Sequence, residues 1–160
     1  MLTALVFTVL SAQADVPLPD ARLTSAAVLR FAALSEGRSI LSADDAFTAS
    51  LSRFDIQCRL KTDNNVALAD WKTFVAQHVR PWQAAKITDA AARLQTRLEK
   101  CRLPLPPVVR LVRTTGEEEN EAAYTRGDAI VLPNKVMNYP ATQLDRLLLH
   151  ELFHILSRHD

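Results

Sequence analysis

The chain has 160 residues, of which 48% are apolar, so it is long enough for one domain with a sizeable core. Lysine and arginine number 19 against 18 aspartates and glutamates, and this near-neutral balance gives no electrostatic reason to expect nucleic acid or an anionic membrane as partner. No apolar run reaches the roughly 18 residues that a bilayer span needs, so no membrane span is expected.

The N-terminus resembles a secretory signal. An apolar run, Leu2–Leu10, is followed by the small-x-small pattern Ala12-Gln13-Ala14, although the usual basic segment before the run is absent. We interpret residues 1–14 as a signal peptide, which predicts export to the periplasm or the extracellular space. A first buried helix or strand is the alternative interpretation.

The two cysteines, Cys58 and Cys101, leave two alternatives open. In an exported chain an even cysteine count favours one disulfide. The other interpretation is two separate buried thiols. Neither cysteine lies in a metal-binding cluster, so neither is expected to be a metal ligand.

Residues 15–105 are predicted to form a helical region. Apolar residues recur at helical spacing between capping residues, and prolines end several of the segments. The expected helices run from about Asp20 to Gly37, from Ser42 to Cys58, from Val66 to Val79 and from Gln83 to Arg102.

The composition changes after the proline-rich segment Leu103–Pro107. Val108–Arg113 is short and rich in β-branched residues, which favours a strand. Ala122–Arg126 and Ala129–Leu132 are expected to be two further strands, joined by a hairpin turn at Gly127-Asp128. The last predicted helix begins near Thr142, where Thr142-Gln143-Leu144-Asp145 has the form of a capping box.

The last helix carries the motif His150-Glu151-Leu152-Phe153-His154. Histidines four residues apart lie on one helix face, where two imidazole nitrogens can bind one Zn²⁺ at about 2.0–2.1 Å. Glu151 lies about 100° further round the helix, so it can act as a general base on water without being a ligand. The motif therefore predicts His150 and His154 as zinc ligands and Glu151 as the catalytic base.

Apolar residues cover most of this helix, which predicts that it is buried. Two histidines and a glutamate in a buried helix are costly to fold unless they have partners, and a metal ion is such a partner. The polar residues share one narrow face: Gln143, Arg146, His150, His154 and Ser157.

These features together resemble the zincin superfamily of zinc metallopeptidases. The resemblance covers about Val108 to Asp160, and the fold it implies is α+β: a helical region, then a small antiparallel sheet, then the active-site helix. We therefore expect residues 106–160 to form the upper part of a zincin-like catalytic domain. The resemblance further implies a peptide or protein substrate that pairs with an edge strand, either Ala122–Arg126 or Ala129–Leu132.

A catalytic zinc takes three protein ligands, and the motif supplies two. The third is expected beyond Asp160, which would make the chain a C-terminally truncated fragment, or else at Asp160 or His159. Asp160 lies ten residues after His150, the metzincin spacing, but Ser157 occupies the position where that pattern has glycine. The three possibilities stay open at this point.

A second function class is also open. The chain can be a non-catalytic helical binding module in which the His150–His154 motif is vestigial or structural. The predicted helical region has no evident chemistry of its own, which is the main support for this alternative. Zinc content of the full-length protein separates the two.

Overall fold

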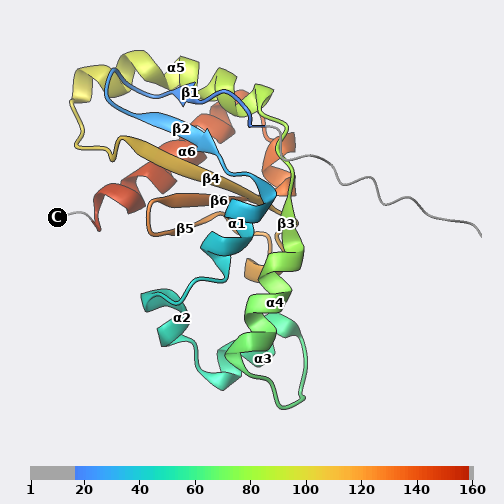
Figure 1. Ribbon diagram of the computed structural model, residues 1–160. Helices are drawn as coiled ribbons and strands as arrows, with labels where there is room; N and C mark the ends of the chain where they lie inside the picture. Colours follow the sequence, from blue (N-terminus) through green and yellow to red (C-terminus); the bar gives the residue numbers. More distant parts are fainter. Residues whose placement is uncertain (1–16, 159–160) are drawn as a thin grey trace, which may run out of the picture.

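A six-stranded mixed sheet lies at the centre of the computed structural model, which describes residues 17–158 (Figure 1). The strand order is β1-β2-β4-β6-β5, with β3 beside the end of β4. Strands β2, β4 and β6 are parallel, and the others pair antiparallel to their neighbours. The strands are β1 (Ala21–Arg22), β2 (Val28–Phe31), β3 (Val79–Arg80), β4 (Val108–Thr114), β5 (Tyr124–Arg126) and β6 (Ala129–Pro133).

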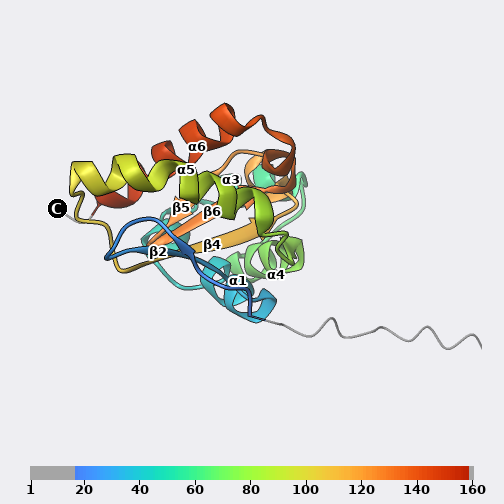
Figure 2. The same cartoon turned by 90° about the horizontal axis from the view of Figure 1, so that it is seen from above.

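Helices cover both faces of the sheet: α5 and α6 lie on one face, and α1 and α4 on the other (Figure 2). None of the helices between residues 17 and 158 is long and apolar enough to cross a membrane. The helices are α1 (Leu34–Leu41), α2 (Ala46–Ser50), α3 (Arg53–Leu60), α4 (Leu68–His78), α5 (Ala85–Cys101) and α6 (Ala141–Leu156), with short 3₁₀ turns η1 (Glu117–Glu119) and η2 (Asn134–Asn138).

Alternation along the central strands divides the core into two layers. Leu111 and Ile130 pack towards α5 and α6, whereas their neighbours Val112 and Val131 pack towards α1, α3 and α4. All four side chains are fully buried. The sheet therefore has no solvent-facing side at its centre, as is usual for parallel strands.

The predicted fold class is wrong about the sheet and about its position relative to the helices. The structure is α+β, but its sheet is central and mixed rather than small, antiparallel and preceded by a helical region. The physical reason is long-range pairing: β2 lies parallel to β4, and Val28 pairs with Val108, 80 residues later. Helical periodicity within one segment carries no information about such a partner.

The predicted helix from Asp20 to Gly37 is also wrong. The segment forms β1 and β2, and helix α1 begins only at Leu34. The strands predicted at Val108–Arg113, Ala122–Arg126 and Ala129–Leu132 are confirmed as β4, β5 and β6 to within about two residues. The predicted signal peptide, residues 1–14, lies outside the described residues.

The disulfide between Cys58 and Cys101 is not formed. Both cysteines are free and exposed, so the alternative of two buried thiols is wrong as well. Cys58 lies on α3 and Cys101 ends α5, and these helices lie at opposite ends of the molecule (Figure 1).

Two glycines with positive φ allow a test of the fold around β6. Gly116 has φ +95°, and a Cβ there would lie 2.7 Å from Pro133 Cβ, whereas Gly127 has φ +52° and open space around it. We expect Gly116→Ala to lower the free energy of unfolding by about 2–4 kcal/mol, because strain and a clash add. Gly127→Ala is the matched control and should cost about 1 kcal/mol. Urea denaturation measures both, and equal losses would contradict the packing around Gly116.

Candidate metal centre

Helix α6 is fixed in rotation by one apolar face. Its buried apolar residues pack against the sheet, and their spacing of three and four residues is that of a single stripe. The stripe consists of Leu144, Leu148, Leu152 and Ile155. Burial of each such side chain contributes on the order of 1.5–3 kcal/mol to the free energy of unfolding. Rotation of the helix about its axis would expose these side chains and lose that stability.

A bidentate ion pair fixes the same helix to α5. Arg93 of α5 donates from Nε and from the terminal NH2 nitrogen to the Asp145 carboxylate at 3.0 and 2.7 Å. The capping box predicted at Thr142 to Asp145 is therefore wrong: the first residue of α6 is Ala141, no side chain caps the helix, and Asp145 pairs with Arg93 instead.

The two histidines converge outside this buried face. The Nε2 atoms of His150 and His154 are hydrogen-bonded to each other at 2.9 Å, and the rings are nearly perpendicular at 89°. His150 is exposed and His154 is half-buried. Two nitrogens at this distance can each lie about 2.0–2.1 Å from one ion, and widening to about 3.3 Å gives the tetrahedral angle that zinc prefers.

Glu151 lies between the sheet and the histidines. At about 100° per residue, Leu148 is at the middle of the buried face, Glu151 is about 60° to one side of it, and His154 about 60° further. Glu151 is only 3% exposed. Burial raises the pKa of its carboxyl above the ordinary value, and the nearby His150, His154 and Arg158 offset part of this.

Within residues 17–158, no group of three His, Cys, Asp or Glu side chains is placed to hold a metal. His150 and His154 are therefore two converging donors without a third in that range. His159 and Asp160, two of the three predicted sources of the third ligand, lie outside the described residues.

Strand β5 forms the edge of the sheet next to this site. It is the last strand in the order, and it contacts α6. Strand β6 lies between β4 and β5, so of the two segments predicted as the edge, only Ala122–Arg126 contains it. The two-residue turn makes Arg126 and Ala129 the hydrogen-bonded pair, so the N–H and C=O of Thr125 point away from β6, to the outer edge of the sheet. Thr125 is buried at this edge.

Arg126 ties this edge strand to the opposite layer. Its side chain is 3% exposed, donates to Asp45 Oδ2 at 2.7 and 2.9 Å, and donates to the Leu41 carbonyl oxygen at 3.3 Å. The guanidinium also lies 4.5 Å from the centre of the Phe47 ring. These contacts attach β5 to α1, α2 and the loop between them, on the face of the sheet opposite α6.

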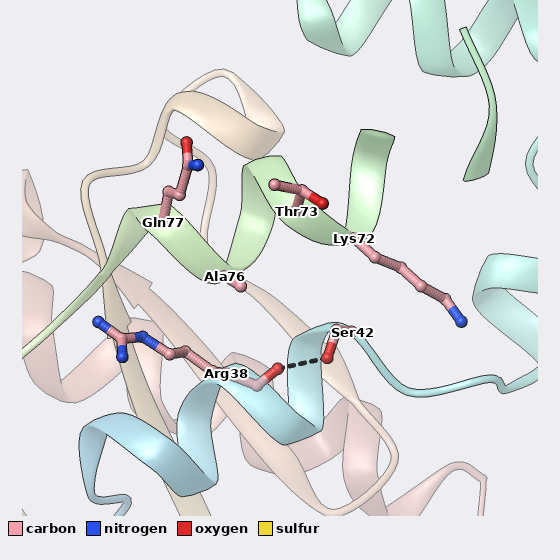
Figure 3. A pocket seen from close by; sticks show the side chains of 6 residues that line it. All are labelled: Arg38, Ser42, Lys72, Thr73, Ala76 and Gln77. Atoms are coloured by element: carbon pink, nitrogen blue, oxygen red, sulfur yellow. Dashed lines mark hydrogen bonds between the residues drawn. The ribbon is translucent and has the colours of Figure 1, made fainter. Parts of the chain in front are cut away.

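A hollow of about 560 Å³ lies between α1 and α4, away from α6 (Figure 3). Figure 3 shows that Arg38, Lys72 and Gln77 point in different directions from it, and Lys72 pairs with Asp44 at 2.6 Å. Polar groups that diverge cannot hold one ligand together.

Comparison with protein-family models, with curated proteins and with solved structures finds no match to this chain. The resemblance to zincins therefore stays a prediction that rests on the chain's own residues. The comparisons decide nothing about catalysis, zinc or export.

The sequence analysis missed Thr125 and Arg126 as parts of the site's surroundings. Both belong to the predicted strand Ala122–Arg126, whose alternation already placed their side chains on opposite faces. What the sequence could not show is which face meets α6, because that follows from the packing of distant elements.

The pair of Asp45 and Arg126 predicts a pH-dependent stability. Burial alone would raise the pKa of Asp45, but hydrogen bonds from Thr48 and Arg126 and the charge of Arg126 together lower it below 3.8. A lowered folded pKa contributes stability that is present above the ordinary pKa and is lost as the pH falls through the folded one. Asp45→Asn should therefore lower the free energy of unfolding by about 1–2 kcal/mol at pH 7, after allowance for solvent screening.

The same variant and the wild type should converge in stability as the pH falls through the lowered pKa of Asp45, since Asp45 is then protonated in both states. Chemical denaturation at pH 7 and at the lowest pH where the chain stays folded measures the difference. A constant difference across this range would show that the Asp45 charge is not involved.

Proposed function

We propose that this chain carries the metal-binding helix of a zinc-dependent metallopeptidase. The observation that supports this best is the arrangement on α6: two imidazole Nε2 atoms converge at 2.9 Å beside a buried carboxylate. The helix contacts β5, the last strand in the order of the sheet. A metal pair, a base and an edge for an extended peptide are the parts that peptide hydrolysis needs.

The donor chemistry fits zinc. Imidazole nitrogen is a common zinc ligand, and His150 and His154 present two such atoms towards one point. Both Nε2 atoms must be unprotonated to bind a metal, so Nδ1 carries the hydrogen in each ring. The third ligand is proposed to come from a segment after His154, with His159, Asp160 and later residues as candidates.

The residues divide the chemistry among them. When bound, zinc supplies Lewis acidity that activates water towards a carbonyl group. Glu151 takes the proton of the attacking water, and the same carboxyl can then give it to the leaving amine. Burial favours this role, because the raised pKa of Glu151 makes its carboxylate a better proton acceptor than an exposed glutamate.

Strand β5 is proposed to hold the substrate. An extended peptide can add to an open sheet edge through main-chain hydrogen bonds, and Thr125 offers one outward donor and one outward acceptor. Because β5 contacts α6, a peptide on this edge would lie beside the helix that carries Glu151. The substrate class is therefore a protein or peptide in an extended conformation.

Metal analysis of the full-length protein, purified without chelator, tests the proposal. We expect one zinc ion per chain, and we expect His150→Ala and His154→Ala each to abolish it, because each variant leaves two of the three proposed protein ligands, too few for a tight site. His78→Ala is the control, since His78 lies on α4 and bonds Thr115, and it should keep the zinc.

Glu151→Gln separates metal binding from catalysis. The variant should keep the zinc and lose at least about 100-fold in hydrolysis of an internally quenched peptide, because the base is removed and the ligands remain. Protein without zinc would favour the non-catalytic alternative. Wild-type hydrolysis by Glu151→Gln would show that Glu151 is not the base.

A further inference from the structure

We propose that one bridging water links the Thr125 hydroxyl to the Glu151 carboxylate and so positions this carboxylate. No direct hydrogen bond joins Thr125 Oγ1 to Glu151 Oε2 in the structure. The positioning role rests on the function proposed above, whereas the pairing itself does not. The proposal stands on the placement of both residues on facing elements and on the lack of a hydrogen-bond partner for Thr125 Oγ1 and for Glu151 Oε2 among the described residues.

Thr125 is the residue of β5 that faces α6. Its neighbours turn to the other side of the sheet: Arg126 pairs with Asp45, and Tyr124 packs with the layer of α1, α3 and α4. Thr125 pairs with Ile130, whose side chain packs against α6. By alternation the Thr125 side chain shares that face.

Glu151 lies on the border of α6 that faces β5. Asp145 and Glu151 flank Leu148 at about 60° on either side. The Asp145 side faces α5, because Arg93 of α5 binds it. Glu151 is therefore on the side away from α5, and we infer that β5 lies there, because α6 contacts β5 and β6 and β5 is the outer strand of the two.

Both groups are buried without a partner. Thr125 is 8% exposed and Glu151 is 3% exposed. Thr125 Oγ1 and Glu151 Oε2 are each fully buried, with no hydrogen bond among the described residues. A buried polar group without a partner is costly, and one water shared by two such groups removes the cost of both.

The pair would let β5 position Glu151 as well as bind the substrate. The main chain of Thr125 faces the outer edge of the sheet, where the substrate is proposed to bind, and its side chain faces α6. A water-mediated link between Thr125 and Glu151 would fix the proposed base relative to Thr125, whose main chain would offer the substrate a donor and an acceptor. Such support of a catalytic side chain by its neighbours sets its reach and direction.

A double-mutant cycle on the purified chain tests the pairing through thermal unfolding. Thr125→Val removes the hydroxyl, Glu151→Leu removes the carboxylate, and the double variant leaves an apolar contact. We expect Thr125→Val to lower Tm by about 3–6 °C in the wild-type background, and by less than about 1 °C when Glu151→Leu is present. Thr114→Val is the matched control, because Thr114 is also a buried strand threonine whose hydroxyl has no partner, and Thr114 should show no coupling to Glu151.

Kinetics on an internally quenched peptide test the positioning role. Thr125→Val should lower kcat about tenfold with KM changed less than about twofold, and Thr125→Ser should restore kcat because it restores the hydroxyl. Thr114→Val should leave both constants unchanged. Additive Tm shifts in the cycle would overturn the pairing, and coupling with an unchanged kcat would overturn the positioning role.

Failure of the proposed function gives a different result. A wild-type protein without zinc or hydrolysis would remove the positioning role, but the cycle would still report the pair. Loss of coupling in a zinc-binding, active protein would instead remove this inference alone.

Discussion

The packing of one face of α6 against the sheet determines the arrangement of the whole site. Leu144, Leu148, Leu152 and Ile155 allow the helix a single rotation, and the ion pair between Arg93 and Asp145 fixes it to α5. In this rotation His150 and His154 lie outside the buried face with their Nε2 atoms converging. Glu151 follows as the residue at the border, buried beside the edge strand and adjacent to the histidines.

The placement of Glu151 has an electrostatic cost that the proposed function explains. A carboxylate that is 3% exposed, with one oxygen buried and unpartnered among the described residues, is unfavourable as an anion, and burial raises its pKa accordingly. A purely structural helix would gain stability from an apolar residue here. A group kept buried near two convergent imidazoles is typical of a site where proton transfer is needed. The ion pair between Arg126 and Asp45 holds β5, the proposed substrate strand, against the opposite layer of the fold.

Short-range patterns predicted much of the site, and long-range pairing accounts for what was missed. The histidine spacing, the helix that carries it and the hairpin at Gly127-Asp128 each depend on fewer than about twenty neighbouring residues, so the sequence shows them directly. The strand at Val28–Phe31 depends on β4, which lies 80 residues later, and its apolar residues fit a helix equally well until that partner is known. The side of α6 that faces β5, and with it the role of Thr125, follows from the same tertiary packing.

X-ray absorption of the zinc-loaded full-length protein tests the central claim, that His150 and His154 bind one metal ion together. The account predicts two imidazole nitrogens at about 2.0–2.1 Å from the zinc, both lost together with the metal in His150→Ala. A spectrum dominated by sulfur at about 2.3 Å would place the zinc at the exposed Cys58 or Cys101 instead and would contradict the account. A zinc environment identical in the wild type and His150→Ala would contradict it equally.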